Sequence, residues 1–381
     1  MVAGRENRNM RILIILLIFI LYGGANYYVA VRIFRMLKFF RNTVSVPLFA
    51  VVFIVISSTV LLSIMGSKAG LSRIISALGS VWIGVLMYLL IFTILADVLL
   101  LILKLTGHSS APRMAVVEAA VLVLTFATVI GGFIHSRNIQ IARYSVDTDK
   151  GSKSFRTVLV SDIHIGALGI EERLPEMVEM INSENPDVVC IAGDIFNNNI
   201  SSIHNPEAVA EALSSIKSEY GVYACLGNHD CGNGFEDMLK LISDSGVTLL
   251  YEDYAVIPEL CVIYGRADSS PVSTTGSVKR HDFDYNVISD FADLPVIVLD
   301  HNPANLGEYT SDISLILSGH THKGQMFPGS LVTGAMYDVD YGMLRKSEDA
   351  PTAIVTSGVG YWGPPIRVGT DSEIAVIEIN K

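Results

Sequence analysis

The sequence predicts a chain in two parts, a bundle of about four transmembrane helices followed by an α/β domain. Half of the 381 residues are apolar and only 17% are charged, which is unusual for a soluble protein. Long apolar runs fill the chain before residue 136, whereas short β-branched runs alternate with helical stretches from Thr157 onwards. Residues 1–145 hold 13 Lys and Arg against three acidic residues, a net charge of +10, so residues 146–381 carry −21 to reach the total of −11.

Four stretches in the first part are long and apolar enough to cross a bilayer, which takes about 20 helical residues. They are residues 12–31, 46–66, 80–103 and 114–134. The breaks between them are polar and basic, as expected for loops between membrane spans. A cleaved signal peptide is the rival interpretation of the first stretch, but three more spans follow it. We therefore expect residues 1–136 to form a multi-pass integral membrane region, in the cell membrane.

The orientation of this region in the membrane is left open. Seven basic residues flank one face and six flank the other, a difference too small for the positive-inside rule. Asp97 lies within the third predicted span, where it is either a functional group or a carboxylate hydrogen-bonded between packed helices. No transport-like set of charged partners accompanies Asp97, so the four spans are interpreted as an anchor.

The second part reads as buried strands alternating with helices. The predicted strands are Thr157–Val160, Val188–Ala192, Val222–Leu226, Val262–Tyr264, Val296–Leu299 and Leu315–Leu317. Residues 171–183 and 205–217 are predicted helices, and Asn205-Pro206 is a typical helix start. Residues 137–156 are expected to be a linker and the approach to the first strand. Residues 157–381 then form an α/β domain with helices on the sheet faces.

The composition of this second part excludes some partners and sites. Its negative charge argues against nucleic acid, because phosphate backbones are bound by Lys and Arg surfaces. Its four cysteines, Cys190, Cys225, Cys231 and Cys261, contain no CxxC pair, so neither a zinc ribbon nor a redox motif is supported. A disulfide between Cys225 and Cys231, across the loop at Gly227, stays open.

Five short polar motifs follow predicted strands almost at once. They are Asp162-Ile163-His164, Gly193-Asp194, Gly227-Asn228-His229-Asp230, His301 and Gly319-His320-Thr321-His322. In α/β sheets, ligands bind beyond the carboxyl ends of the strands, so motifs at five strand ends are expected to converge on one site. Carboxylates, an amide and imidazoles without a thiolate suit Mn, Fe or Zn. The sequence therefore predicts a site for divalent metal ions.

The motifs occur in the order D-x-H, GD, GNHD, H and GHTH. This ordered set resembles the calcineurin-like metallophosphoesterase family over about residues 157–378. GHTHKGQ, Gly358–Gly360 and Pro365–Arg367 are similar to its membrane-associated branch, although Lys323 stands where that branch usually has glycine. The resemblance implies a four-layer α/β/β/α sandwich with two mixed sheets.

The resemblance also implies two divalent cations, of Mn, Fe or Zn. One would be held by Asp162, His164, Asp194 and His322. The other would be held by Asp194, Asn228, His301 and His320, so that Asp194 bridges the pair. Two cations that share a carboxylate lie about 3.5–4 Å apart, a spacing that suits displacement at phosphorus.

The activity that this implies is hydrolysis of phosphate ester or pyrophosphate bonds by a hydroxide that bridges the metals, in a phosphodiesterase or a phosphatase. His229 is the candidate general acid, and Asp230 is expected to orient His229 or another imidazole of the site. Lys323 either reaches a substrate phosphate or faces solvent. Arg367 either binds a phosphate or forms a surface ion pair.

We therefore expect a membrane-anchored phosphoesterase. A lipid-linked phosphate ester suits it as a substrate, because the anchor would hold the site beside the bilayer. The alternative function is that of a catalytically weak membrane sensor or scaffold, which would use the domain for binding. All five motif blocks are intact, which favours the enzyme.

Overall fold

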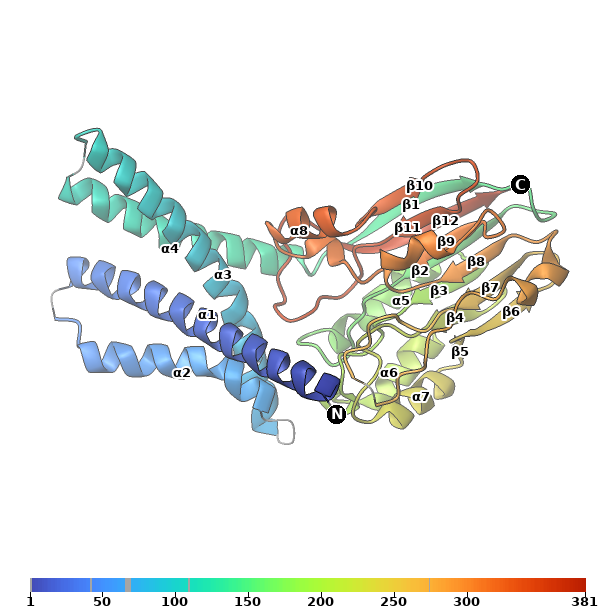
Figure 1. Ribbon diagram of the computed structural model, residues 1–381, viewed down its shortest axis with the longest axis horizontal. Helices are drawn as coiled ribbons and strands as arrows, with labels where there is room; N and C mark the ends of the chain where they lie inside the picture. The colour runs from blue at the N-terminus through green and yellow to red at the C-terminus, as the bar shows by residue number, and fades with distance from the viewer. Residues whose placement is uncertain (1, 42, 66–69, 109, 274) are drawn as a thin grey trace. The chain divides into compact units, whose positions relative to one another are not determined.

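The computed structural model describes residues 2–41, 43–65, 70–108, 110–273 and 275–381 (Figure 1). The chain divides into two compact units, Met1–Gly131 and Gly132–Lys381. The first unit consists of long apolar helices, and the second is an α/β domain.

The first unit contains the four helices that the apolar runs predict. They are α1 (Val2–Phe40), α2 (Val46–Met65), α3 (Gly70–Leu105) and α4 (Ala111–His135), the last of which continues into the second unit. Each contains a segment long and apolar enough to cross a membrane: Leu16–Phe39, Val46–Ser63, Ile74–Leu105 and Pro112–His135. Most side chains of these segments are not buried within the protein, which is the pattern expected of helices surrounded by lipid.

The one acidic residue of the third segment lies in an ionic cluster. The Arg32 guanidinium of α1 lies 2.7 Å from Asp97 of α3 and 2.6 Å from Glu118 of α4. The Tyr28 hydroxyl also donates to Asp97. These contacts join three helices and match the interpretation of Asp97 as a carboxylate that holds packed helices together.

The second unit contains two six-stranded mixed sheets. The first has the order β1-β12-β2-β3-β4-β5, and the second has the order β10-β11-β9-β8-β7-β6. The strands of the first sheet are β1 (Ile139–Asp147), β2 (Phe155–Val160), β3 (Val188–Ala192), β4 (Val222–Cys225), β5 (Thr248–Leu249) and β12 (Ser372–Asn380). Those of the second are β6 (Asp253–Ile257), β7 (Cys261–Gly265), β8 (Val296–Leu299), β9 (Leu315–Ser318), β10 (Gly342–Arg345) and β11 (Thr352–Val355). All six predicted strands are present, and β2, β3 and β4 run parallel, as do β7, β8 and β9.

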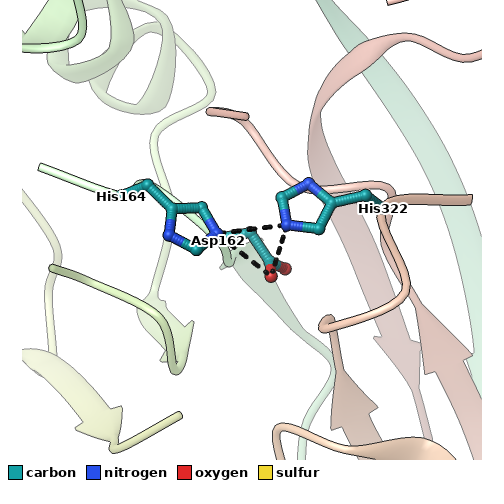
Figure 2. A group of neighbouring side chains, drawn as sticks. All are labelled: Asp162, His164 and His322. Carbon is teal, nitrogen blue, oxygen red and sulfur yellow. Dashed lines mark hydrogen bonds and ion pairs between the residues drawn. The ribbon is translucent and has the colours of Figure 1, made fainter. Parts of the chain in front are cut away.

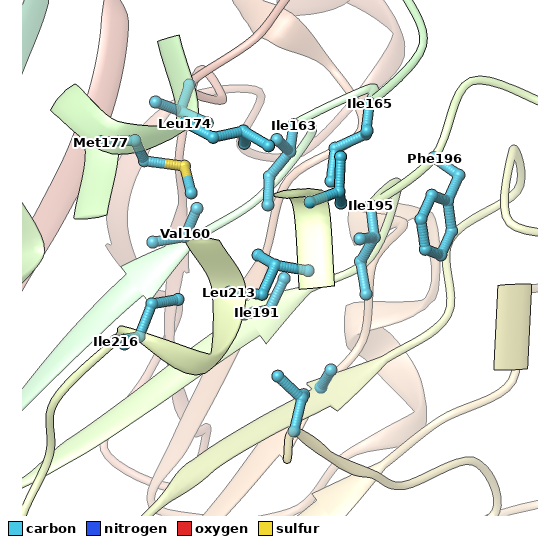
Figure 3. Packing of buried hydrophobic residues seen from close by; sticks show 14 of the residues in the cluster. Val160, Ile163, Ile165, Leu174, Met177, Ile191, Ile195, Phe196, Leu213 and Ile216 are labelled. Atoms are coloured by element: carbon cyan, nitrogen blue, oxygen red, sulfur yellow. The ribbon is translucent and has the colours of Figure 1, made fainter. Parts of the chain in front are cut away.

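Three helices cover the outer face of the first sheet: α5 (Leu174–Ser183), α6 (Pro206–Ser214) and α7 (Phe235–Asp244). The first two confirm the predicted helices, and the Asn205 side chain accepts a hydrogen bond from the Ala208 amide at the start of α6. Figure 3 shows Leu174 and Met177 of α5 and Leu213 of α6 in one cluster with Val160 and Ile191 of the sheet. This apolar layer fixes the sheet from which three of the polar motifs emerge.

The two sheets face each other across a second apolar core. Leu159 and Cys190 of the first sheet pack there with Ile263, Leu299 and Leu317 of the second. Cys225 and Cys261 belong to the same core, and all four cysteines of the described chain are buried free thiols, so the open disulfide is not formed. On the outer face of the second sheet the described residues form 3₁₀ turns and loops, which pack apolar side chains against the sheet.

The segment expected to be a linker contains a full strand. β1 pairs in parallel with β12 along its whole length, from Ile139 beside Ser372 to Asp147 beside Asn380. Most of the side chains between its ends are exposed or only half-buried, so β1 is an edge strand without the continuous apolar run that marks the central strands. Helix α4 ends at His135, and only three residues separate it from the start of β1. This junction is held to the second unit by two hydrogen bonds: the Arg367 amide donates to the Gly132 carbonyl, and the Ser136 hydroxyl donates to the Pro365 carbonyl.

Candidate metal centre

The polar motifs lie beyond the carboxyl ends of central strands in both sheets. Asp162 follows β2, Asp194 follows β3 and Asn228 follows β4. His301 follows β8 and His320 follows β9 in the facing sheet. The His301 imidazole donates from Nδ1 to the Ala192 carbonyl at the end of β3, with a separation of 2.8 Å, so the two sets of loops meet. The structure thus brings motifs far apart in the sequence to one place.

A first group of possible metal ligands consists of Asp162, His164 and His322 (Figure 2). His322 Nε2 lies 3.2 Å from Asp162 Oδ1 and 3.1 Å from His164 Nε2. Burial lowers the pKa of His164 to about 3, so its imidazole is neutral and offers a lone pair. Two imidazole nitrogens facing each other beside a carboxylate fit a divalent cation, which binds nitrogen and oxygen at about 2.0–2.2 Å.

A second group consists of Asp194, Asn228, His301 and His320. His301 Nε2 lies 3.3 Å from Asp194 Oδ2 and 3.2 Å from Asn228 Oδ1. His320 Nδ1 lies 2.8 Å from the same Asn228 oxygen. Because His301 Nδ1 donates to a carbonyl, Nε2 is the ring atom that faces Asp194 and Asn228 and is placed to bind a cation in exchange for its proton. The donor atoms therefore converge as ligands of one cation do.

Asp194 stands between the two groups. Its Oδ2 atom is 3.3 Å from His301 Nε2 of the second group and 3.7 Å from His164 Nε2 of the first. Its other oxygen, Oδ1, accepts a hydrogen bond of 2.8 Å from the His229 amide. Burial raises the pKa of this carboxyl, but the neighbouring imidazoles, His301 above all, hold it well below its usual range. Asp194 is thus an ionised carboxylate that both groups can share.

The backbone at these ligands is strained. Five of them adopt a left-handed conformation, with φ between 48° and 69°: Asp162, His164, Asp194, His320 and His322. Such conformations are uncommon outside glycine, although Asp, Asn and His tolerate them best. Each costs about 1–3 kcal/mol and persists only where the surrounding structure imposes it. The concentration of strain at one place is typical of a functional site.

One glycine allows the loops to approach so closely. A Cβ atom on Gly227 would lie 2.2 Å from Asp194 Oδ1 and 2.4 Å from the Asp194 amide nitrogen. No side chain fits there, so glycine at this position lets the loop after β4 pass directly over the shared carboxylate.

Residues 155–324, which include all of these ligands, match the model of the calcineurin-like phosphoesterase family. The chain carries a calcineurin-like metallophosphoesterase domain. The strand-end motifs that predict the site are therefore the motifs of this domain.

Relatives with the same domain cover different shares of the chain. An uncharacterized metallophosphoesterase of Helicobacter pylori is 31% identical over 237 residues, which cover 61% of this chain and 61% of that protein. A transmembrane protein with metallophosphoesterase domain from Danio rerio is 29% identical over 320 residues, which cover 78% of this chain and 72% of that protein. An uncharacterized metallophosphoesterase of Campylobacter jejuni is 24% identical over 380 residues, which cover 95% and 97%. The similarity to the last two extends into the apolar helices.

His229 of the metallophosphoesterase domain lies beside the first ligand group. Its ring centroid is 5.2 Å from that of His164 and 6.1 Å from that of the exposed Trp362. Its Nδ1 atom lies 2.8 Å from Asn198 Oδ1, which leaves Nε2 as the free nitrogen. Burial lowers the pKa of His229. Asn198 has no place in any motif, and the run Asn197–Asn199 soon after Asp194 is the only signal that could have indicated it.

Asp230 makes contacts that differ from the expected ones. Its buried carboxylate accepts hydrogen bonds from the backbone amides of Ile195, Phe196 and Gly227. Burial, together with the charge of Asp194, raises the pKa of Asp230 to about 7. Asp230 thus joins the loops after β3 and β4, and the residue that contacts the His229 ring in the expected way is Asn198.

The two residues named as substrate ligands lie in different surroundings. The Lys323 ammonium lies 3.9 Å from the centroid of the Tyr341 ring. Arg367 is fully buried, and its guanidinium donates to the carbonyls of Ser357, Gly358 and Gly360. A fully buried guanidinium bound to three carbonyls is neither a surface ion pair nor open to a substrate. Arg367 instead holds the loop whose Val359 and Gly360 amides donate to the carbonyls of Ser161 and Asp162.

Proposed function

We propose that the protein is a membrane-anchored, metal-dependent phosphoesterase that uses two divalent cations at the shared Asp194. The observation that carries this proposal is the convergence of two sets of buried imidazoles and carboxylates on the carboxylate of Asp194. That donor set suits Mn, Fe or Zn and contains no thiolate. The family match and the strained backbone support the same conclusion.

The ligand groups fit the two cations that the domain implies. Asp162, His164 and His322 would hold one of them, and Asn228, His301 and His320 would hold the other. Asp194, which lies 3.3 Å from His301 and 3.7 Å from His164, would be common to both. When bound, such a pair supplies positive charge to the phosphoryl oxygens and a water of lowered pKa. The protein contributes the fixed positions of these ligands and a buried wall that excludes other water.

His229 is the candidate that donates a proton to the leaving oxygen. It stands beside the ligand groups without belonging to either, and its amide donates to Asp194. Asn198 accepts a hydrogen bond from Nδ1, so Nε2 is the ring atom that would first take up a proton, to form the imidazolium, and then donate it to the leaving oxygen. Asn198 is thus a positioning residue for this step.

The four candidate spans support the membrane anchor in this proposal. A substrate that is itself held by lipid, such as a phosphoester of a lipid headgroup, would meet the anchored site at high local concentration. The family match names phosphoesters in general, so the lipid-linked substrate is the finer part of the proposal.

The test uses the full chain in lipid nanodiscs, first freed of metal and then supplied with Mn²⁺. Two measurements are made, the metal content per chain and the hydrolysis of bis-p-nitrophenyl phosphate and p-nitrophenyl phosphate. We expect two metals per chain and metal-dependent turnover. In Asp194→Asn both are lost, whereas His229→Ala keeps its metal and loses turnover by about 10²–10⁴-fold.

The matched control is His204→Ala, which removes an exposed imidazole paired with Glu171 away from the ligand groups. It should leave both measurements unchanged. The proposal would be overturned if the unaltered chain bound no metal and showed no turnover. Two bound metals without turnover on any phosphoester would favour the binding function instead.

A further inference from the structure

Helix α8 (Gly329–Met336), labelled in Figure 1, has exposed apolar side chains. Leu331, Val332 and Met336 are 65%, 58% and 69% exposed, and none of the side chains of this described helix is buried. Together with Ala335, they occupy positions i, i+1, i+4 and i+5, which lie on one side of a helix. The other side carries Thr333, whose hydroxyl donates to Asp340. A helix on a soluble domain normally faces its apolar side inwards, so α8 has the reverse arrangement.

The chain leading into α8 lies beside the end of the last candidate span. Within the second unit, the Arg367 amide donates to the Gly132 carbonyl in the last turn of α4, at 3.0 Å. The next residue, Val368, bridges to Met326, and its carbonyl accepts from the Phe327 amide at 2.8 Å. The last turn of α4 is itself apolar and open, with Ile134 65% exposed. The segment Arg367–Val368 therefore lies between the chain that precedes α8 and the last turn of α4, and it is hydrogen-bonded to both.

This proximity identifies the occupant of the exposed face. A helix of eight residues is about 12 Å long. The interfacial zone on each side of the hydrocarbon core is about 5–8 Å deep. A short helix that starts beside the end of a membrane span is within reach of this zone. The net charge of residues 146–381, −21, does not favour attraction to an anionic surface, so apolar burial is expected to supply the attraction.

The same helix is directly connected to the metal ligands. His322 lies in the 3₁₀ turn η6 (His322–Gly324), and only six residues separate it from Gly329. A Cβ atom on Gly324 would lie 2.1 Å from the Ser330 amide nitrogen, so this turn packs against the first turn of α8 with no room for a side chain. A surface that holds α8 in place therefore also holds the turn that carries His322.

We propose that the apolar face of α8 lies in the headgroup region of the bilayer and presents the metal centre to phosphoesters carried by lipid at that surface. This inference rests on the proposed anchoring and phosphoesterase activity, and it deepens them by naming the docking element and the substrate class. Two outcomes would contradict the proposal: the face is covered by a second copy of the chain, or it is covered by the protein's own apolar helices.

The first experiment measures the position of α8 in the full chain, in nanodiscs of neutral phosphatidylcholine. A fluorophore is attached to Val332→Cys, since the four native thiols are buried. The matched control is Ser311→Cys, an exposed residue before the amino end of β9, whereas α8 follows the carboxyl end of that strand. We expect nitroxide-labelled lipid to quench the label at 332 at least about threefold more than at 311. Equal quenching would overturn the proposal, and so would a label at 332 that is shielded from water but not quenched by lipid.

The second experiment tests the substrate class with Leu331→Glu/Met336→Glu. We expect about tenfold slower hydrolysis of a phosphatidyl p-nitrophenol ester embedded in the nanodisc, since charge on this face opposes insertion. Hydrolysis of soluble bis-p-nitrophenyl phosphate and the two bound metals should be unchanged. Equal loss on both substrates would overturn the substrate assignment, because the change would then act through the fold. Lipid quenching at 332 without hydrolysis of either ester would instead reject the phosphoesterase activity and leave the docking of α8 intact.

Discussion

The two ligand groups differ in what holds their imidazoles. In the second group, His301 donates from Nδ1 to the Ala192 carbonyl, so its ring is fixed before any metal binds. In the first group, the Nδ1 atoms of His164 and His322 are buried without a hydrogen-bond partner among the described residues. A histidine that binds a metal usually donates its other ring nitrogen, and this contact strengthens metal affinity about 10–100-fold. We therefore infer that the second group is preorganised, whereas the first depends on packing and on its strained backbone.

The largest effect is expected where the two groups meet. Gly227→Ala would place a methyl group against the Asp194 carboxylate and displace the ligand that both groups share. We expect loss of both cations and more than about 100-fold loss of turnover, because a shift of about 1 Å at a reacting centre has that effect. Metal content and turnover are measured beside Gly307→Ala, whose added methyl meets no atom within 4 Å. Retention of one tightly held cation would show that Asp194 serves a single group.

Stepwise removal of metal separates the groups from each other. During titration with a chelator, we expect the unaltered chain to lose its cations in two steps that differ about 10–100-fold in affinity. His322→Ala should abolish the weaker step, and His301→Ala should abolish the stronger one. Release of both cations in a single step would contradict the difference between the groups.

Arg367 reaches the first group through the loop that it holds, since the Gly360 amide donates to the Asp162 carbonyl. Arg367→Lys would leave buried carbonyls without their donors, and each such carbonyl costs about 1–3 kcal/mol. We expect lower thermal stability and weaker binding at the first group, while the second group keeps its affinity. Arg345→Lys, at an exposed guanidinium that also donates to backbone carbonyls, serves as the control. Equal weakening of both groups would show that the loop supports the whole domain.

The smallest effect belongs to a residue outside both groups. Asn198→Ala would remove one hydrogen bond to the His229 ring, worth about 1 kcal/mol, or about fivefold in rate. We expect a lower kcat with unchanged KM and two bound metals, measured beside Asn286→Ala at an exposed site. A loss of metal in Asn198→Ala would mean that this residue supports the ligands rather than the proton transfer.

The sequence predicted the central strands because their side chains are apolar on both faces. Val188–Ala192 and Val296–Leu299 are buried along their whole length and agree with the predicted bounds. The half-exposed β1 and the glycine-containing α8 lack a comparable signal, since their residues do not fill the core. The sequence indicated only parts of the two sheets. Strands from near the end of the chain complete them: β12 lies between β1 and β2, and β11 lies between β10 and β9.

The ligand residues were predictable as motifs, whereas the contacts that hold them were not. Asn198 and the three amides bound by Asp230 come together only in the folded chain. Arg367 illustrates the same limit. From the sequence, a charged arginine side chain is expected at the surface, but in the structure the Arg367 guanidinium is buried and donates to three backbone carbonyls. Burial and partner choice depend on tertiary packing, which local sequence does not encode.

The left-handed backbone at the ligands has a consequence for attempts to change the metal that this centre prefers. Replacing His164 or His322 by cysteine, to favour a softer ion, would alter the donor atom and also place a less tolerant residue at a positive φ. A mutational scan would record both losses as one. Glycine at the same position removes the donor while relieving the backbone. The difference between the glycine and alanine variants would therefore measure the conformational part of each ligand's contribution, because both lack the donor atom.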